Sequence, residues 1–381
     1  MGACAQRVTS PRPQVQGPVV TATQTQTPEV TSAAGPEVRD GTARIGLLLP
    51  LTGGPPGDPG NAMLHAAEIA LLDLGVDNVE LLPRDTHGTE DGAREAANAV
   101  IADGANIILG PFFGRSVPGV ADVARSRGLS VIAFTTDASV AGSNVLVMGF
   151  LPGNEVDRII QYGKAQGLES YAVLAPQDRY GEVVAQAAEE VARARGVRLG
   201  AVQFYSTEIG DYSELVRSVV ENGGYDAVLL PDAGLRLRAV ASLIPYYGGD
   251  SMHMLGTGIW AGQAIGAEQA LQGAWYAAPQ PELRAAFEDR YEQLNGSRPP
   301  LVAALAYDAV SLAARLMQQP GFRAYDHQTL TDSSGFAGIS GIFRFDARTG
   351  LVQRGLAVME VTENGTVVRE AAPESFVAAG L

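Results

Sequence analysis

From residue 43 onward, short apolar runs alternate with longer amphipathic segments. Residues 43–50 (ARIGLLLP) have the continuous apolar character of a buried strand. A Gly- and Pro-rich loop follows, and residues 63–74 then repeat apolar side chains at the spacing of one helix face. Because strand, loop and helix recur in this order, the pattern predicts an α/β fold with parallel sheets.

The alternation falls into two blocks that meet near residue 148. The first block continues with predicted strands at 79–83, 106–109 and 129–133 and helices at 89–103 and 116–128. The second has predicted strands at 171–175, 202–205, 227–230 and 252–255 and helices at 155–165, 180–195, 212–221 and 234–246. We therefore expect two doubly wound parallel-sheet lobes.

The helix and strand pattern of the C-terminal third predicts that the chain crosses between these lobes more than once. Two helices, 282–294 and 301–318, have apolar faces but no sheet of their own, so we expect them to cover the first lobe. Segments 341–345 and 355–361 flank the turn DARTG and predict a hairpin. The expected division is a disordered tether at 1–41, lobe 1 at 42–148 and 279–335, and lobe 2 at 149–278 and 336–381, joined by a multi-strand hinge.

The N-terminal segment differs in composition from the rest of the chain. Residues 5–41 are rich in Thr, Gln, Pro and Val without periodicity, which is typical of a tether. Gly2 and Ala3 before Cys4 resemble the end of a bacterial lipobox and predict a lipid-modified Cys4. No apolar segment stands before them in this sequence, so a chance match stays open. N-myristoylation fits less well because Gln6 stands where that motif requires Ser or Thr.

Charge and motif content narrow the function classes. The net charge is −15 and Lys164 is the one lysine, which argues against nucleic acid as a partner. One cysteine leaves no internal disulfide and no Cys-based zinc site. The four histidines have no ligand spacing, so no metal and no cofactor is expected. Because HExxH, G-x-S-x-G, P-loop and G-x-G-x-x-G motifs do not occur, we expect a protein that is not an enzyme.

Candidate binding chemistry is concentrated in residues 110–139. Ser116 precedes an amphipathic helix, and Thr135, Thr136 and Asp137 follow a buried strand. Ligands of open α/β sheets sit outside the carboxyl ends of strands, where helix N-termini offer unpaired N–H groups. These side chains therefore predict one edge of a ligand site, with a helix cap and ordinary loop polarity as the alternatives.

Several segments in this order resemble the type I periplasmic-binding-protein superfamily, and within it the leucine/isoleucine/valine-binding group. They are IGLLLPLTGGPPGDPGNAMLHAAEIAL, Asp85-Thr86 with the following helix and IILGPFFGRSV, GLSVIAFTTDAS, and YAVLAPQDRYGEVVAQAAEE. The resemblance covers nearly all of residues 43–361. It implies a solute-binding protein of an ABC-type importer in the periplasm, with an amino-acid-like ligand in the cleft and a membrane permease as partner.

The resemblance also implies roles for single residues. The loop at Ser116 would hold a carboxylate, Thr135, Thr136 and Asp137 would add donors and an acid, and Tyr180 in DRYGE would cap the ligand from lobe 2. Four assignments have alternatives. Arg115 could pair with an anionic ligand or face solvent, and Asp232 could bind the ligand or cap a helix. Trp260 could form an apolar wall or pack in the core, and Tyr180 could pack on the hinge instead of capping the ligand. Residues 255–260 (LGTGIW) lack the acid that amino-acid binders carry there.

A second resemblance leads to a different function. Penicillin-binding-protein activator lipoproteins combine a lipidated cysteine, a linker and the same fold. Their C-terminal pattern resembles Gly338-Ile-Ser-Gly341-Ile-Phe-Arg-Phe and Arg354-Gly-Leu-Ala-Val. Under this alternative the partner would be a peptidoglycan synthase and the protein would regulate cell-wall synthesis.

Overall fold

The structure is a computed structural model that describes residue 1 and residues 36–38, 41–53, 59–208 and 210–376. Cys4 and most of the predicted tether lie outside the described residues. The described chain from residue 36 onward belongs to one compact unit, Ser32–Leu381.

The first sheet is entirely parallel and has the order β2-β1-β3-β4-β5. Its strands are β1 (Ala43–Leu49), β2 (Val79–Asp85), β3 (Ile107–Leu109), β4 (Val131–Ala133) and β5 (Val145–Val147). Strands β1 and β2 have seven residues each, and β3, β4 and β5 have three each. We call this sheet with its covering helices the first lobe.

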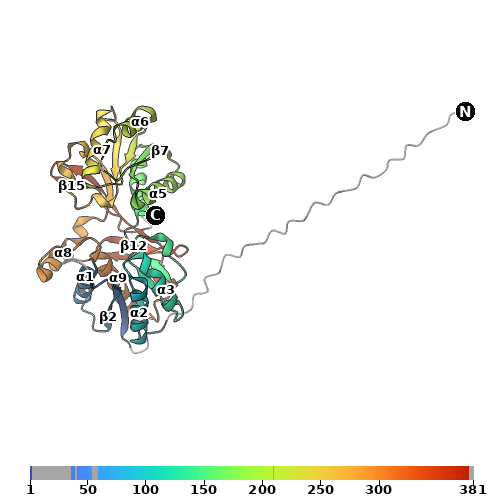
Figure 1. Cartoon of the computed structure of the whole chain (residues 1–381). Helices are drawn as coiled ribbons and strands as arrows, with labels where there is room; N and C mark the ends of the chain where they lie inside the picture. Colours follow the sequence, from blue (N-terminus) through green and yellow to red (C-terminus); the bar gives the residue numbers. More distant parts are fainter. Residues whose placement is uncertain (2–35, 39–40, 54–58, 209, 377–381) are drawn as a thin grey trace. The chain divides into compact units, whose positions relative to one another are not determined.

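Helices cover both faces of the first sheet (Figure 1). One face packs against α1 (Pro59–Leu74) and α9 (Ala303–Met317), and the other against α2 (Glu90–Ala102) and α3 (Val117–Arg125). Along β1, Ile45 and Leu47 face α1 and α9, whereas Leu48 faces α2 and α3. Strand periodicity thus sends alternate side chains into two separate cores.

The second sheet has the order β15-β14-β10-β9-β8-β6-β7. The five strands from β10 to β7 are parallel to one another. Strand β14 pairs antiparallel with β10, and β15 pairs antiparallel with β14. The strands are β6 (Ser170–Pro176), β7 (Arg198–Tyr205), β8 (Ala227–Leu229), β9 (His253–Gly256), β10 (Trp275–Ala278), β14 (Ala357–Thr362) and β15 (Gly365–Glu370). This sheet and its helices form the second lobe.

One face of the second sheet holds α4 (Pro152–Ala165) and α5 (Arg179–Arg195), and the other holds α6 (Ser213–Gly223) and α7 (Gly234–Tyr246). Short 3-10 turns complete the connections: η1 (Gly114–Ser116), η2 (Ala138–Val140), η3 (Gly258–Trp260), η4 (Ile265–Ala267) and η5 (Gln269–Leu271). The predicted α/β class with two doubly wound parallel sheets is confirmed.

The chain passes between the two sheets three times: from β5 to α4, from β10 to α8 (Pro281–Asn295) and α9, and from β13 (Val352–Arg354) to β14. Helix α9 packs on α1 and β1, and α10 (His327–Leu330) follows it. Three connections between two lobes are the usual basis of a hinge.

The predicted C-terminal hairpin is wrong in its pairing. Strand β12 (Gly341–Phe345) pairs with β13 and with β11 (Phe336–Gly338) in a separate antiparallel sheet. Strand β14 instead joins β10 and β15. Phe343 and Phe345 pack in the core of the first lobe, although the sequence analysis assigned residues 336–354 to lobe 2. The strand that follows the turn DARTG is β13, because Val352 pairs with Phe345 of β12 and also packs in the first-lobe core.

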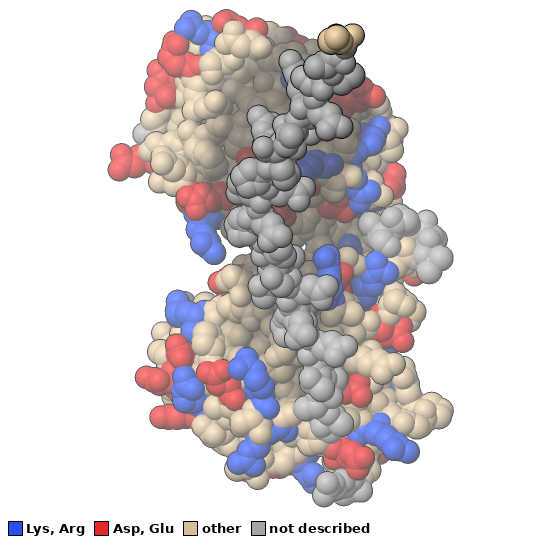
Figure 2. Space-filling model, turned by 90° about the vertical axis from the view of Figure 1, so that its right-hand side faces the viewer, with Lys and Arg blue, Asp and Glu red and all other residues tan. Residues whose placement is uncertain are grey.

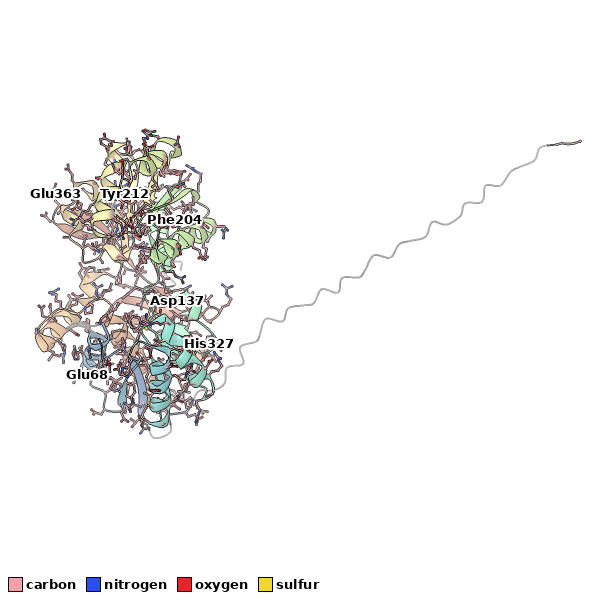
Figure 3. All side chains as sticks on the ribbon, viewed as in Figure 1. Glu68, Asp137, Phe204, Tyr212, His327 and Glu363 are labelled. Carbon is pink, nitrogen blue, oxygen red and sulfur yellow. The ribbon has the colours of Figure 1, made fainter. Side chains whose placement is uncertain are left out.

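Charged side chains of both signs are interspersed over the face shown in Figure 2. Figure 3 labels three acidic side chains on separate parts of the chain: Glu68 on α1, Asp137 at the start of η2 and Glu363 between β14 and β15. No helix in the described part of the chain is long and apolar enough to cross a membrane.

Candidate ligand-binding site

A cavity of about 760 Å³ is lined by residues of both lobes, and we call it the inter-lobe cavity. The first-lobe wall comes mainly from the loops after β3 and β4, with Leu351 before β13, and the second-lobe wall from the start of α4 and from one side of α5 between Arg179 and Glu190. Its lining residues are Phe113, Gly114, Arg115, Thr136, Asp137, Ala138, Ser139, Leu151, Pro152, Gly153, Arg179, Tyr180, Val183, Gln186, Ala187, Glu190 and Leu351. Parallel strands of both sheets therefore end at one shared space.

Glycine allows the two first-lobe loops to meet. A Cβ on Gly114 would lie 3.0 Å from the Thr135 hydroxyl oxygen and 3.0 Å from the Asp137 Cβ. The Thr135 hydroxyl accepts the Asp137 N–H at 3.0 Å, so it is committed to the loop, and Thr135 is not part of the cavity lining. Thr136 is exposed and lines the cavity. The predicted Thr pair thus divides into one loop-stabilising residue and one cavity residue.

Asp137, labelled in Figure 3, lines the first-lobe wall of the inter-lobe cavity with its carboxylate. Its Oδ1 accepts the Ser139 N–H at 3.0 Å and the Ser139 hydroxyl at 2.6 Å. These hydrogen bonds, the hydroxyl first, and the charge of Arg179 lower the pKa of the Asp137 carboxyl. The carboxylate is therefore ionised at neutral pH and faces a cation of the second lobe.

Arg115 is exposed, and two contacts within the described part of the chain hold its side chain. Its Nε donates to the Gly88 carbonyl oxygen at 2.9 Å, and its guanidinium carbon lies 4.5 Å from the centre of the Phe113 ring. Both contacts hold the side chain along the wall of the inter-lobe cavity. The remaining guanidinium N–H groups are the ones open to an anion.

Ser116 is fully buried at the start of α3. It occupies the N-cap position but its hydroxyl makes no capping hydrogen bond, and within the described structure its Oγ has no partner. The sequence analysis predicted a ligand-binding hydroxyl with a helix cap as the alternative; the capping hydrogen bond is not formed, and Ser116 does not line the inter-lobe cavity. A buried hydroxyl without a partner costs free energy, so a ligand group that satisfied it would gain affinity.

Tyr180 forms the second-lobe wall together with the apolar side chains of Val183 and Ala187 and the polar side chains of Arg179, Gln186 and Glu190. Its hydroxyl lies 2.8 Å from the Thr257 hydroxyl, which is buried in the loop after β9. Burial, followed by the charge of Glu155, raises the pKa of the Tyr180 phenol, so this group stays neutral.

Asp232 and Trp260 are placed elsewhere. Asp232 is buried and accepts hydrogen bonds from the Tyr205 hydroxyl at 2.8 Å and from Arg236 at 2.9 Å. It is not the N-cap of α7, a position held by Ala233. Trp260 is fully buried in the second-lobe core and donates its indole N–H to the Asp232 carbonyl oxygen at 3.1 Å. Neither residue lines the inter-lobe cavity.

The sequence analysis missed Glu155, Arg179 and Phe113. Arg179 and Phe113 stood inside the quoted segments DRYGE and GPFFGRSV, beside residues that were chosen. Nothing in the sequence marked Glu155 as a buried residue near the site, because an acid in the first turn of a helix normally lies at the surface. The structure buries it with 6% of its surface exposed.

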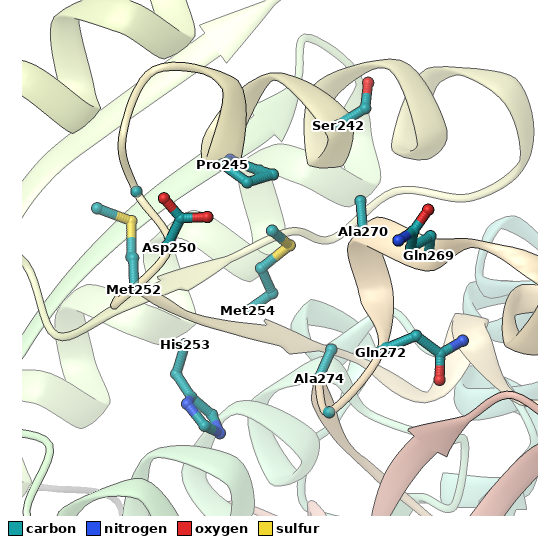
Figure 4. A pocket seen from close by; sticks show the side chains of 12 residues that line it. Ser242, Pro245, Asp250, Met252, His253, Met254, Gln269, Ala270, Gln272 and Ala274 are labelled. Atoms are coloured by element: carbon teal, nitrogen blue, oxygen red, sulfur yellow. The ribbon is translucent and has the colours of Figure 1, made fainter.

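A second cavity, of about 590 Å³, lies within the second lobe near the start of β9 (Figure 4). Met252 and Met254 point toward the helix that holds Ser242 and Pro245, and His253 points to the other side of the strand. Because this cavity lies at the amino end of β9, it lacks the strand-end loops that make the inter-lobe cavity polar. No group of three or more metal-ligating side chains occurs among the residues described.

Residues 42–366 match the sequence pattern of a family described as periplasmic binding protein, and the chain belongs to this family. The predicted membership of the type I periplasmic-binding-protein superfamily is confirmed. The family consists of binding proteins rather than enzymes, and it works in the periplasm.

Solved structures share the fold. A Rhodospirillum rubrum protein described as a branched-chain amino acid ABC transporter has a TM-score of 0.75 and 21% identity, over 86% of this chain and 99% of that chain. A leucine binding protein, LivK, from Thermotoga maritima has a TM-score of 0.57 and 18% identity, over 87% and 99%. A Rhodopseudomonas palustris solute binding protein in complex with 3,4-dihydroxy benzoic acid has a TM-score of 0.58 and 16% identity, over 88% and 99%.

One curated relative is similar over a shorter stretch. The Uncharacterized protein RP748 of Rickettsia prowazekii is 22% identical over 133 residues, which is 35% of this chain and 36% of that protein. The match spans about a third of the relative's length.

Proposed function

We propose that this protein is the solute-binding component of an ABC-type importer, and that it holds a small amino-acid-like carboxylate in the inter-lobe cavity. The observation that carries the proposal is the cavity itself, which both lobes line with polar and charged side chains as well as with aromatic and aliphatic ones. Its volume of about 760 Å³ lies within the range of roughly 300 to 1,000 Å³ typical of small-molecule sites.

The first-lobe wall supplies the carboxylate subsite of the proposal. Helix α3 begins there, and N–H groups at a helix N-terminus favour an anion. The exposed Thr136 lines the cavity and adds a hydroxyl donor, and the Ser116 hydroxyl, which lacks a partner within the described structure, is buried next to the lining residue Arg115 and does not itself line the cavity. The Arg115 guanidinium, held by Gly88 and Phe113, adds positive charge.

The second-lobe wall supplies the surface for the rest of the ligand. Tyr180, Val183 and Ala187 of α5 present aromatic and aliphatic groups to the cavity. This chemistry suits a solute with an apolar or aromatic body. Leucine and 3,4-dihydroxy benzoic acid, which appear in the descriptions of two structural relatives, are both carboxylates with such a body.

A lipid anchor would keep the protein near a membrane permease, and we propose that Cys4 carries this lipid. In a gene with its upstream coding region, Cys4→Ser should release the protein into the soluble periplasmic fraction. Retention of that variant in the membrane fraction would show that the Gly2-Ala3-Cys4 match is accidental.

The ligand proposal is tested by thermal unfolding with a panel of L-amino acids, aliphatic carboxylates and hydroxybenzoates. A ligand at a hundred times its Kd adds about 2.7 kcal/mol to stability, which is a readily measured rise in Tm. We expect at least one carboxylate to produce it. If none does, and the protein stimulates a purified peptidoglycan synthase, the alternative function as a synthase activator replaces this proposal.

A further inference from the structure

A buried ion pair lies where the chain passes between the two lobes. Arg354 is the last residue of β13, directly before the third crossing, and Asp308 belongs to α9 in the first lobe. Both side chains are buried, and the Arg354 Nη1 and the Asp308 Oδ2 are 4.0 Å apart. A charge-assisted hydrogen bond is shorter, at about 2.7 to 2.9 Å. The two charges therefore attract each other without a direct hydrogen bond.

Arg354 also joins the first crossing to the third. Its Nη2 donates to the Met148 carbonyl oxygen at 2.8 Å, and its guanidinium carbon lies 4.9 Å from the centre of the Phe150 ring. Both of these residues lie in the segment between β5 and α4. On the other side, the Phe343 ring of β12 has its centre 5.6 Å from the same carbon. A movement of either crossing would therefore displace this guanidinium relative to Asp308.

The glycine pattern that resembles the synthase activators holds the other partner of the pair. The Ile339 N–H donates to the Asp308 Oδ1 at 2.7 Å. A Cβ on Gly338 would lie 2.5 Å from the same oxygen, so the backbone can approach the carboxylate this closely only without a side chain. The two halves of the pattern, Gly338-Ile339 and Arg354, thus meet at one carboxylate, and Oδ2 is the oxygen left for the guanidinium.

The pair is incomplete in this arrangement of the lobes. Within the described structure, the Asp308 Oδ2 and the Arg354 Nε and Nη1 have no hydrogen-bond partner. Buried charges are costly unless they are both paired and hydrogen-bonded. Among the described residues, no hydrogen bond or ion pair joins the first-lobe loops at 113–139 to α5, so the walls of the inter-lobe cavity are not in polar contact. A shift of Arg354 by about 1 Å toward Asp308 would supply the missing bond.

We propose that the Asp308–Arg354 pair is a hinge latch that favours closure of the two lobes. Closure moves the crossings, and the Arg354 guanidinium then donates directly to the Asp308 carboxylate. Neither residue lines the inter-lobe cavity, so the latch acts on the equilibrium between open and closed lobes and not on a ligand. The inference goes beyond the proposed function and does not depend on which solute the cavity takes.

The test measures the distance between the lobes in the full-length protein without ligand, by electron paramagnetic resonance between two spin labels. Cysteines replace Ser126, exposed at the end of α3, and Ala194, exposed on α5, and Cys4→Ser removes the native cysteine. Because α3 and α5 belong to opposite lobes, closure shortens this distance. Measurements at pH 7.5 keep the Asp308 carboxyl ionised, since burial raises its pKa to about 6.

Two variants weaken the latch in different ways. Asp308→Asn combined with Arg354→Gln removes both charges and keeps polar groups for the neighbouring backbone. Arg354→Lys keeps the positive charge and a donor for the Met148 carbonyl oxygen, but a single ammonium lacks the second arm of the guanidinium. The control, Asp232→Asn with Arg236→Gln, neutralises a pair within the second lobe, away from the crossings.

We expect a short-distance population in the wild type and the same population in the control. In both latch variants the ratio of the short-distance to the long-distance population should fall by about tenfold, because a charge-assisted hydrogen bond of the closed state is lost.

Three results would overturn the inference. A wild type without a short-distance population means that the pair does not favour closure. Equal populations in the wild type and the latch variants mean that the pair has no influence on the lobes, and a larger short-distance population in the variants means that it holds the lobes open. Arg354→Lys decides the matter should the double variant not fold. Because no ligand is present, the failure of every carboxylate in the thermal panel would affect the proposed function alone.

Discussion

The protonation of Glu155 makes the stability of the second lobe depend on pH in a direction opposite to that of most carboxylates. Burial raises the pKa of this carboxyl from 4.5 to about 8. The folded state therefore prefers the neutral acid, whereas the unfolded state ionises freely above pH 4.5. The stabilisation is fully present below pH 4.5 and is lost as the pH rises through 8.

The size of the effect follows from the pKa difference. At about 1.4 kcal/mol per pKa unit, the free energy of unfolding should fall by about 3 kcal/mol between pH 5 and pH 8 on account of this group alone. The titratable neighbour shown to sense its charge, Tyr180, stays neutral over this range because its own pKa is raised. Replacement by Gln preserves the size of the side chain and an acceptor for Gly258.

The assay is urea unfolding followed by tryptophan fluorescence at pH 5, 6, 7 and 8. Both tryptophans, Trp260 and Trp275, belong to the second lobe, so the signal reports the lobe that contains Glu155. We expect Glu155→Gln and the wild type to be about equally stable at pH 5. At pH 8 the variant should be more stable by about 3 kcal/mol.

A stability difference that does not change with pH would refute the reasoning, because it would mean that the carboxyl titrates alike in the folded and unfolded states. A variant less stable than the wild type at pH 8 would contradict it more strongly, since the ionised carboxylate would then be a stabilising group. Glu182→Gln serves as the control for removing a first-turn carboxylate from an exposed position.

Three further predictions concern single side chains. Ser116→Ala should leave the Tm unchanged or slightly raised, because it removes a buried hydroxyl without a partner, yet it should weaken carboxylate binding in calorimetry by about tenfold. Trp260→Ala should cost about 3 to 5 kcal/mol in urea unfolding, whereas cavity residues keep their positions and ligand affinity changes little. Asp232→Ala leaves Arg236 and the Tyr205 hydroxyl without their acceptor and should cost about 2 kcal/mol or more in the same assay, again without a specific loss of ligand binding.

The regular elements of both lobes could be predicted because their strands are apolar runs flanked by helical periodicity. The β1 strand and the helices α2 and α5 show this well. Strands β11, β13 and β15 were missed because they are short or mostly exposed, and GTVVRE in β15 has little burial to impose alternation. The pairing of β12 depends on a core position of Val352 that periodicity does not reveal.

The site was predicted better on its first-lobe wall than on its second. Residues at strand ends, such as Thr136 and Asp137, follow from topology, because parallel strands bring their carboxyl ends together. Asp232 and Trp260 also follow strands, but a contact within the second lobe, the indole N–H on the Asp232 carbonyl oxygen, turns them into the core. Glu155 could not be found from sequence, since its burial depends on a glycine one hundred residues away in the chain, at Gly258.

The central claim is that the inter-lobe cavity binds a small carboxylate, and a blocking variant tests it most directly. Thr136→Trp places an indole in the cavity from an exposed loop position, and Ser143→Trp places one at an exposed turn outside the lining. For the carboxylate that raises the Tm most, calorimetry should show binding to the wild type and to Ser143→Trp, and at least a hundredfold weaker binding to Thr136→Trp. Equal affinity in all three proteins would contradict the account, because the ligand would then bind somewhere other than this cavity.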